Sequence, residues 1–409
     1  MRTSILAVGT ELLFGQTVNT NAAYLSENLN IMGFDVMYHF VVGDNPARLK
    51  EKLAEAFIDT DLVLITGGLG PTQDDLTKET VAEYMGAGMH LDERVVDDLK
   101  GFFEKRGRQM SENNMKQAYL PDGCTPFYNA SGTAPGFALS KDGKTAVCFP
   151  GPPREMKWLF ENGVRQYLEQ FMEKKMCYRV IRTIGIGESD LEMLLMPLID
   201  GQTDPTIATY AKEGECTLRV ASQRDTAEEA ERAVSAMTAR IDALAGEYIY
   251  SHDDEELNEV VVGILKKKGL HISAAESCTG GMFASAITDV AGASEVLSAS
   301  YVTYSEKAKA EELGIDPAII ARCGVVSAET AVAMAKGAKA RSGADIAVSV
   351  TGYAGPEADP GREAGEAYIG YAFGDLSGHF ELHTSRADRK WNRRYFTLRM
   401  LRAVYMLIR

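Results

Sequence analysis

Apolar and polar positions alternate along the first 170 residues in a rhythm of strands and helices. The predicted strands are residues 4–8, 35–42, 61–66 and 145–149, and the predicted helices are residues 21–32 and 46–58. Apolar residues run continuously in the strands and recur every three or four positions in the helices. This order predicts a mostly parallel, doubly wound sheet. Ligands in such sheets bind at the carboxyl ends of the strands, so the loops there are candidate sites.

Three of these loops, at residues 9–13, 67–75 and 150–156, carry glycines and charged residues. Glycines let the backbone approach a phosphate closely, and carboxylates can hold a hard divalent cation. Arg154, near the start of a predicted helix, offers a phosphate clamp. The alternative interpretation is a tight turn whose aspartates cap the helix from Leu76 onward. The candidate nucleotide-binding residues are Gly9, Thr10, Glu11, Gly67, Gly68, Gly70, Pro71, Thr72 and Arg154.

Residues 171–250 have a different character. The predicted strands are 178–184, 206–210 and 216–222, and the predicted helices are 188–199 and 226–244. This is a small α+β module. An RNA-binding role would call for a GxxG loop in basic surroundings, whereas Gly185-Ile186-Gly187-Glu188 is acidic and lacks that spacing. A structural or dimer-forming spacer is therefore favoured over nucleic-acid binding.

Residues 251–409 alternate helix and strand again and predict a second α/β domain. The polar segment 251–256 is the predicted linker into it. The predicted helices are 257–268, 279–290, 306–313, 328–342 and 388–408, and the predicted strands are 270–275, 299–305, 345–350, 366–373 and 379–385. The three predicted domains therefore span residues 1–170, 171–250 and 251–409.

The chemistry of the last domain centres on Ala275-Glu276-Ser277-Cys278-Thr279-Gly280-Gly281, at a predicted strand-to-helix turn. Such a turn aims free N–H groups and the positive end of a helix dipole at a ligand. Only six histidines occur, none in these motifs, which disfavours a Ser-His-Asp triad. Ser277 would be the nucleophile, with Lys309 as the base, acting directly or through the Tyr304 hydroxyl. The structural alternative is that Ser277 or Thr279 caps a helix while Lys309 lies on a solvated face.

Further candidates surround this turn. The N–H groups of residues 278–280 could stabilise an oxyanion. Cys278 is a rival nucleophile, because a helix N-terminus lowers a thiol pKa. Arg389 and Arg393 fall at helical spacing and could bind a phosphate. The candidate oxyanion and substrate-binding residues are Cys278, Thr279, Gly280, Gly281, Gly352, Ala354, Gly355, Arg389 and Arg393.

Composition narrows the classes of function. The 409 residues carry a formal net charge of −15, which argues against generic nucleic-acid binding but not against a local basic pocket. No apolar run is long enough to span a membrane, and no signal-peptide cleavage pattern is present. Six cysteines are scattered without a CxxC pair, which indicates neither a zinc site nor a disulfide framework. We expect a reduced, cytoplasmic protein.

The motifs carry a family resemblance. Residues 9–13, 66–75 and 150–156 resemble the molybdopterin-binding-type domain and, more narrowly, the amino-terminal half of the CinA (competence/damage-inducible) family. Domains that bind molybdopterin usually have Asp where this chain has Thr10, which favours the CinA branch. Residues 275–281, 302–309, 324–327 and 352–356 resemble the CinA carboxy-terminal domain, whose stand-alone relatives are nicotinamide-nucleotide amidases.

The resemblance implies two α/β domains, a doubly wound molybdopterin-binding-like one and an amidase, joined by a small α+β KH-like domain. The first would hydrolyse ADP-ribose to AMP and ribose 5-phosphate with Mg²⁺ or Co²⁺, the metal candidates being Asp74, Asp75 and Glu11. The last would deamidate nicotinamide mononucleotide to nicotinate mononucleotide and ammonia without a cofactor, the catalytic candidates being Ser277, Tyr304 and Lys309. The implied partners are pyridine and adenine nucleotides and a second copy of the chain, with no nucleic acid and no membrane.

Two alternatives stay open. One is a molybdopterin-related nucleotidyl transferase built on the first domain. The other is a non-catalytic nucleotide-binding protein. Residues 357–363 keep the second alternative open, because the family usually has paired glycines there and this chain has a more acidic loop that would oppose phosphate binding.

Overall fold

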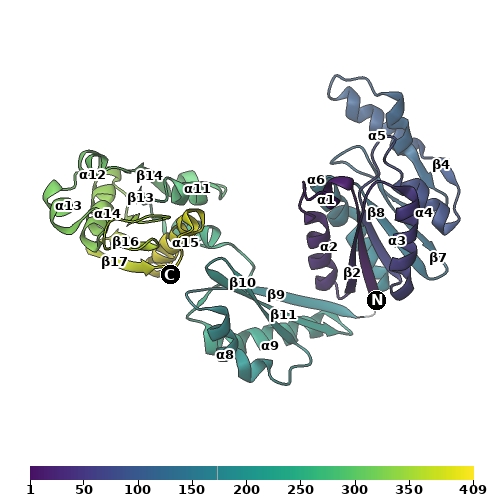
Figure 1. The fold of residues 1–409 in the computed structure, drawn as a ribbon. Coiled ribbons are helices and arrows are strands. Elements are labelled where there is room, and N and C mark those ends of the chain that lie inside the picture. The colour runs from purple at the N-terminus through teal and green to yellow at the C-terminus, as the bar shows by residue number, and fades with distance from the viewer. Residues whose placement is uncertain (173) are drawn as a thin grey trace. The chain divides into compact units, whose positions relative to one another are not determined.

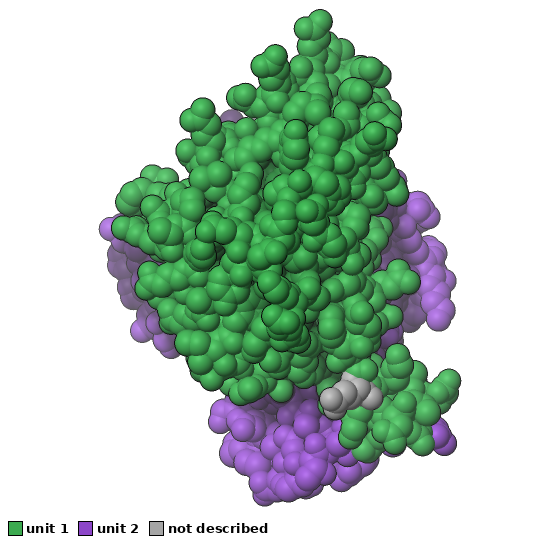
Figure 2. Space-filling model, turned by 90° about the vertical axis from the view of Figure 1, so that its right-hand side faces the viewer, with its two compact units in different colours: residues 1–177, 223–231 green, residues 178–222, 232–409 purple. Residues whose placement is uncertain are grey.

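The computed structural model describes residues 1–172 and 174–409. The chain forms two compact units (Figure 2). The first contains residues 1–177 and 223–231, and the second contains residues 178–222 and 232–409. Most of the predicted middle domain therefore belongs to the second unit. No helix in these residues is long and apolar enough to cross a membrane.

The first unit is built on a six-stranded sheet (Figure 1). In spatial order its strands are β2 (Asp35–Val42), β1 (Arg2–Val8), β3 (Leu62–Thr66), β8 (Lys144–Phe149), β7 (Gly136–Lys141) and β6 (Thr125–Phe127). The first four strands are parallel, and β7 and β6 run antiparallel at one end. The prediction of a mostly parallel sheet is confirmed.

Helices cover both faces of this sheet because alternate strand residues are apolar on both sides. Leu6 packs with α3 (Pro46–Asp59) and α4 (Thr77–Met85), whereas Ile5 packs with α2 (Thr20–Ile31) and α6 (Pro153–Leu159). The predicted helix 46–58 begins at Pro46 because Asn45 caps it, accepting a hydrogen bond from Arg48 N at 3.0 Å. The remaining elements are α1 (Thr10–Leu13), β4 (Met89–Leu91), α5 (Glu93–Glu104), a 3₁₀ helix (Glu112–Ala118), β5 (Tyr119–Pro121), a π-helical turn (Phe160–Val164), α7 (Arg165–Leu168) and a 3₁₀ turn (Glu169–Phe171).

The middle module is a four-stranded sheet with two helices, one strand more than the sequence predicts. Its strands, in spatial order, are β10 (Thr206–Lys212), β11 (Glu215–Arg224), β9 (Lys175–Ile184) and β12 (Ile249–Ser251), and its helices are α8 (Glu188–Ile199) and α9 (Ala227–Ala245). The alternating apolar positions of β11 are buried, among them Leu218 and Val220. The short strand β12 is the element that the sequence analysis does not predict.

The second unit ends in a five-stranded sheet (Figure 1). Its strands, in spatial order, are β14 (Leu297–Val302), β13 (Ile272–Glu276), β15 (Ile346–Gly352), β16 (Glu366–Phe373) and β17 (Leu376–His383). The first three are parallel, and the last two form an antiparallel hairpin. The helices are α10 (Leu257–Lys268), α11 (Met282–Thr288), α12 (Glu306–Leu313), α13 (Pro317–Cys323), α14 (Ala328–Ser342) and α15 (Arg389–Ile408), with a 3₁₀ turn at Ala293–Glu295.

The two faces of this sheet are covered by different helices. Ile272 and Ala274 of β13 pack with α10, α11 and α15, whereas Ala275 packs with α13 and α14. The sequence analysis misses α13 although its signals are present, since Asp316 caps it and Pro317 is its first residue. The predicted helix 279–290 begins only at Met282. Gly280 and Gly281 have φ values of +62° and +94°, a left-handed conformation that cannot be part of an α-helix.

Candidate active sites

The turn at residues 277–281 follows the fully buried strand β13, between the parallel strands β14 and β15. Side chains of consecutive strand residues point to opposite faces of a sheet. Glu276 therefore points toward α11, and Ser277 points to the other side, toward α12. Ser277 is only 8% exposed.

Lys309 is the partner of Ser277. The lysine lies on α12, whose start is fixed by Ser305 accepting a hydrogen bond from Ala308 N at 3.1 Å. Its Nζ donates to Ser277 Oγ at 3.1 Å and to the carbonyl oxygen of Thr303 at 2.7 Å. The side chain is fully buried, and this burial lowers the pKa of Lys309 to about 8. The predicted nucleophile and base are thus in direct contact, and Lys309 is not on a solvated face.

Cys278, the rival nucleophile, is nearly fully buried. Burial raises the pKa of the Cys278 thiol to about 12, and it outweighs the backbone N–H groups of Cys278 and Thr279 and the cations Lys309 and Arg389, which all lower this pKa. The lowering expected from the N–H groups of the turn is present, but burial outweighs it, so the net shift of this pKa is upward. A thiol with so high a pKa is protonated at neutral pH, so this environment favours Ser277 as the nucleophile.

The backbone N–H groups of the turn divide into two sets. Gly280 N donates to Ser277 O at 3.1 Å, and Gly281 N donates to the Glu276 carboxylate at 3.0 Å. The N–H groups of Cys278 and Thr279 have no oxygen acceptor within the described part of the chain. Of the predicted oxyanion donors, these two are the ones left open for a ligand.

Glu276 has no role in the sequence analysis, yet it organises this turn. Its carboxylate accepts hydrogen bonds from Thr279 Oγ1, from the N–H groups of Gly281, Phe283 and Ala284, and from Ser300 Oγ, at 2.7–3.3 Å. It is fully buried. A carboxylate immediately before a Ser-x-Thr-Gly-Gly turn, at the end of an apolar strand, is the sequence signal that could have identified it.

Two arginines of α15 make hydrogen bonds to the turn and to the residues beside it. Arg393 donates from Nε to Cys278 O at 3.1 Å and from Nη2 to Thr279 O at 2.7 Å. Arg389 donates from Nη1 to Gly355 O at 3.0 Å and from Nη2 to the Tyr304 hydroxyl at 2.9 Å. Arg393 thus binds backbone carbonyls. Tyr304 is 63% exposed and contacts Arg389, and no hydrogen bond joins it to Ser277 or Lys309 in the residues described.

Strand β15 ends at Gly352, and the loop that follows it borders the same site and contains Ala354 and Gly355. Asn392, which the sequence analysis also misses, fixes this loop by donating from Nδ2 to Ala354 O at 2.9 Å and to Arg386 O at 2.7 Å. Beyond it lies the acidic segment 357–363. There Asp359 accepts a hydrogen bond from the Tyr353 hydroxyl at 2.7 Å, so one of the acidic groups has a local partner.

The first unit offers a second candidate site, at the carboxyl ends of β1, β3 and β8. Strand β1 lies between β2 and β3, so the chain leaves β1 toward one side and returns on the other. Ligands bind at such a topological switch point. Asn21 of α2 joins two of the loops, because its Nδ2 donates to Thr66 Oγ1 at 2.9 Å and to Gly151 O at 2.8 Å.

The loop after β1 pairs with the loop after β2. Thr10 donates from its N–H and its hydroxyl to one carboxylate oxygen of Asp44, at 2.9 and 2.8 Å. The Glu11 carboxylate folds back over Gly9, where an added Cβ would lie 2.6 Å from Oε1. In the described chain the Glu11 backbone carbonyl accepts a hydrogen bond from Gln16 N at 3.0 Å, but no hydrogen bond or ion pair to the Glu11 carboxylate is found. Glu11 is therefore available to a ligand, whereas Thr10 is engaged.

The loop after β3 contains the remaining candidates. Gly67 has φ +108° and passes so close to β1 that an added Cβ would lie 2.1 Å from Val8 O. Asp75 accepts a hydrogen bond from Thr72 N at 2.9 Å and another from the Thr72 hydroxyl. Helix α4 begins at Thr77 without a side-chain cap. The interpretation that aspartates cap this helix is therefore wrong, since Asp75 stabilises its own loop.

Some groups of this loop and its neighbours are available to a ligand, and one lysine stabilises the loop. The N–H groups of Gly68 and Gly70 have no oxygen acceptor in the part of the chain described. Pro71 lies next to them, and Asp74 is exposed at the loop tip. Lys116 stabilises the loop by donating hydrogen bonds to the carbonyl oxygens of Thr72 and Asp75. Arg154, at the start of α6, is exposed.

The carboxylates of the first unit could bind a divalent metal either as an all-protein site or together with substrate phosphates. Among the described residues, no three His, Cys, Asp or Glu side chains are grouped to hold a metal ion. Glu11, Asp74 and Asp75 therefore do not form an all-protein cage. Mg²⁺ usually keeps several waters and binds through one or two carboxylates together with substrate phosphates. The residues present fit a metal that arrives with a diphosphate.

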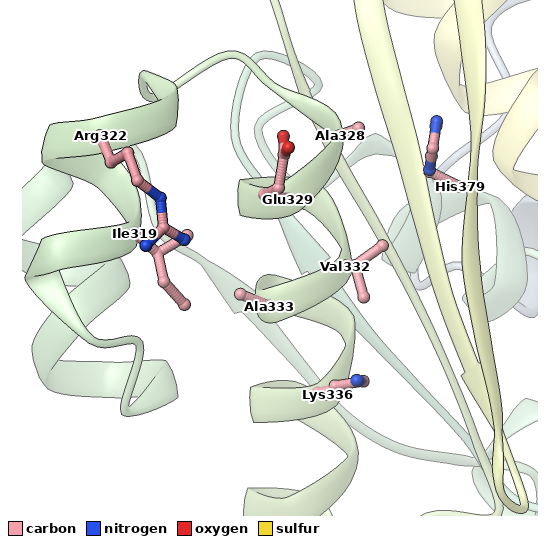
Figure 3. Close-up of a pocket in the computed structure, with 8 residues that line it drawn as sticks. All are labelled: Ile319, Arg322, Ala328, Glu329, Val332, Ala333, Lys336 and His379. Carbon is pink, nitrogen blue, oxygen red and sulfur yellow. The ribbon is translucent and has the colours of Figure 1, made fainter.

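A separate pocket of about 410 Å³ lies on the surface of the second unit (Figure 3). Its lining comes from α13, α14 and β17 and includes Arg322, Val332, Lys336 and His379. None of the predicted site residues lines it. The chemistry of the Ser277 turn therefore does not extend to this pocket.

Comparison with known families matches all three regions of the chain. Residues 4–170 match the probable molybdopterin binding domain, residues 178–251 the damage-inducible protein CinA KH domain, and residues 254–408 the CinA C-terminal domain. A putative competence-damage inducible protein of Caldicellulosiruptor saccharolyticus is 47% identical over 386 residues, 94% of each chain. A CinA-like protein of Dictyoglomus thermophilum is 46% identical over 403 residues, 98% of each chain. The crystal structure of the protein CinA from Thermoplasma acidophilum, at 35% identity and a TM-score of 0.37, covers 42% of this chain and 97% of its own.

Proposed function

The chain belongs to the CinA family, and from this premise we propose that it is a bifunctional hydrolase of pyridine-nucleotide salvage. Its last domain would deamidate nicotinamide mononucleotide, and its first would hydrolyse ADP-ribose. Both substrates are breakdown products of NAD. The observation that carries the amidase proposal is the buried contact between Ser277 Oγ and Lys309 Nζ, at 3.1 Å.

The amidase reaction follows from this contact in two halves. In the first, neutral Lys309 takes the proton of Ser277 Oγ as the oxygen attacks the carboxamide carbon. The N–H groups of Cys278 and Thr279 stabilise the oxyanion that forms. When the intermediate collapses, the C–N bond breaks, and the lysine ammonium gives its proton to the leaving amine, which departs as ammonia. Ser277 is then an ester of the nicotinate group.

In the second half, water replaces ammonia. Lys309 takes a proton from water, which attacks the ester carbon, and then returns the proton to Ser277 Oγ as nicotinate mononucleotide leaves. The lowered pKa of Lys309, about 8, makes this possible near neutral pH, since about one lysine in ten is then neutral. An unperturbed lysine, with a pKa near 10.4, would be neutral in far fewer molecules.

The test is ammonia release from nicotinamide mononucleotide by the purified protein and by Ser277→Ala. We expect release by the wild type and its loss in the variant. Release that persists in Ser277→Ala would contradict Ser277 as nucleophile. A well-folded wild type that releases no ammonia would contradict the amidase itself and favour the non-catalytic alternative.

For the first domain, the supporting observation is that loops from adjacent parallel strands meet at a switch point with open N–H groups and carboxylates. The N–H groups of Gly68 and Gly70 would bind the diphosphate, and Arg154 would neutralise part of its charge. Glu11 and Asp75, with Asp74, would hold a divalent cation. When bound, such a cation acts as a Lewis acid on the phosphoryl oxygens. Water would break the P–O–P linkage and leave AMP and ribose 5-phosphate.

This half of the proposal has a direct test against the molybdopterin alternative. The full-length protein is assayed for AMP release from ADP-ribose with Mg²⁺ or Co²⁺, and for pterin binding. AMP release without pterin binding supports the hydrolase. Pterin binding without AMP release would favour the molybdopterin-related alternative. The homodimer and the cytoplasmic location stay predictions.

A further inference from the structure

Glu276 stands out among the buried charged groups of the second unit. It is fully buried and lies directly before Ser277, but the mechanism above gives it no role. Its carboxylate is surrounded by hydrogen-bond donors only. Oε2 accepts from Thr279 Oγ1 at 2.7 Å, Gly281 N at 3.0 Å and Phe283 N at 3.1 Å. Oε1 accepts from Ala284 N at 3.0 Å and Ser300 Oγ at 3.3 Å.

This arrangement places an internal anion at the start of α11. Three of its five donors are backbone N–H groups at the beginning of the helix, which have no partner within the helix. A negative charge at a helix N-terminus is favourable because of the helix dipole. The start of α11 is therefore satisfied by the protein itself, and these N–H groups are not available to a substrate phosphate.

The Glu276 carboxylate and two cations, Arg393 and Lys309, fix the turn together. Glu276 binds the side chain of Thr279 and the N–H of Gly281, and Arg393 binds the carbonyl oxygens of Cys278 and Thr279. Lys309 binds Ser277 Oγ. The N–H groups of Cys278 and Thr279 adjoin the Cys278 thiol and have no oxygen acceptor in the described structure.

We propose that Glu276 is a positioning residue of the amidase, which holds the 277–281 turn so that Ser277 Oγ meets Lys309 while the N–H groups of Cys278 and Thr279 stay open for the oxyanion. The inference rests on the amidase function proposed above. Glu276 touches no reacting atom and acts through the backbone that it holds. A displacement of about 1 Å between reacting groups costs about 100-fold in rate, so loss of this support has a large effect.

The main variant is Glu276→Gln, which keeps the size of the side chain. An amide places an NH₂ donor where the carboxylate had an acceptor, so donors face donors on one side of the group. We expect kcat for nicotinamide mononucleotide to fall about 100-fold, with KM within about threefold of the wild type. The KM is expected to hold because the nucleotide itself contacts other groups. A general loss of folding would instead reduce the active fraction and the melting temperature together.

Two milder variants keep the carboxylate and remove single donors. Thr279→Val deletes the hydroxyl at 2.7 Å but keeps the N–H proposed for the oxyanion, and Ser300→Ala deletes the weaker contact at 3.3 Å. We expect losses in kcat in the order Glu276→Gln, Thr279→Val, Ser300→Ala. This series keeps the proposal testable if Glu276→Gln does not fold, because wild-type kcat in Thr279→Val together with wild-type exchange of the turn would overturn it.

Hydrogen exchange of the amides at 278–284 provides a readout that needs no catalysis. We expect faster exchange in Glu276→Gln and wild-type exchange in Ser300→Ala. Unchanged exchange and unchanged kcat in Glu276→Gln would overturn the proposal. If the wild type releases no ammonia, the proposed function fails. The exchange experiment then still shows whether Glu276 holds the turn, so the two failures are distinguishable.

Discussion

The two candidate sites both follow the ends of parallel strands, but they differ in how complete they are. In the second unit, the nucleophile, base and turn are buried and joined by hydrogen bonds, with Ser277 8% exposed and Lys309 fully buried. In the first unit, Asp74 is exposed, Asp75 is bound to its own loop, and no described group of three metal-ligating side chains exists.

The difference follows from the chemistry proposed for each site. An acyl transfer without a cofactor needs its nucleophile, base and oxyanion donors in place before the substrate arrives. A metal-assisted hydrolysis can receive part of its charge and geometry from the cation and the diphosphate. Removal of one side chain from the preformed site of the second unit should therefore cause a large loss of activity. The activity of the incomplete site of the first unit should depend on the divalent cation that is added.

The largest expected effect is at Lys309. We expect Lys309→Met to reduce kcat/KM for nicotinamide mononucleotide by about 10³-fold or more, because no other base contacts Ser277 Oγ in the described chain. The matched control is Lys307→Met, since Lys307 lies two residues away with its side chain 79% exposed. Its activity should equal that of the wild type. Equal losses in both variants would contradict the assignment of the base, and hydrolysis of ADP-ribose should be unchanged in both.

The next effect is at Asp75. We expect Asp75→Asn to reduce metal-dependent release of AMP from ADP-ribose about 100-fold, which corresponds to about 2.7 kcal/mol of transition-state stabilisation. The amide oxygen still accepts from Thr72, so the loop is preserved while the charge is lost. Exposed Asp97 on α5 offers a control, Asp97→Asn, with wild-type activity expected. Unchanged activity in Asp75→Asn across a titration of Mg²⁺ and Co²⁺ would exclude this carboxylate from the metal site.

The pH dependence should separate the two sites. The base must be neutral to act, and burial lowers the pKa of Lys309 to about 8. We therefore expect kcat/KM of the amidase to be level above about pH 8 and to fall about tenfold for each pH unit below it. The ADP-ribose reaction should not show this limb, because Lys309 takes no part in it. An amidase profile that is flat from pH 6 to 9 would contradict the role of Lys309.

The sequence predicts the architecture better than the contacts within the sites. Helices 306–313 and 328–342 are found at the predicted residues, because Ser305 and Ser327 cap their starts and glycines follow their ends. Ser277 and Lys309 are predicted from their residue types and are found in contact. The role of Asn392 is not predicted, because it holds a loop 38 residues away in the chain. The role of Glu276 is also missed, although four of its five donors lie within eight residues of it. Burial, which sets the pKa of Cys278 and of Lys309, is likewise a property of the packed structure.

The smallest expected effect concerns Tyr304, and it tests whether the preformed site is confined to the buried pair. If the base acted through the tyrosine hydroxyl, Tyr304→Phe would lose most of its kcat. The hydroxyl instead accepts from Arg389 Nη2 at 2.9 Å, while Lys309 reaches Ser277 directly at 3.1 Å. We therefore expect Tyr304→Phe to lower kcat by less than about fivefold, since one exposed hydrogen bond contributes about 1 kcal/mol or less. Steady-state kinetics decides between the two routes, because a loss of about 100-fold in kcat would show that the proton passes through the Tyr304 hydroxyl. The active site would then include this exposed tyrosine as well as the buried pair.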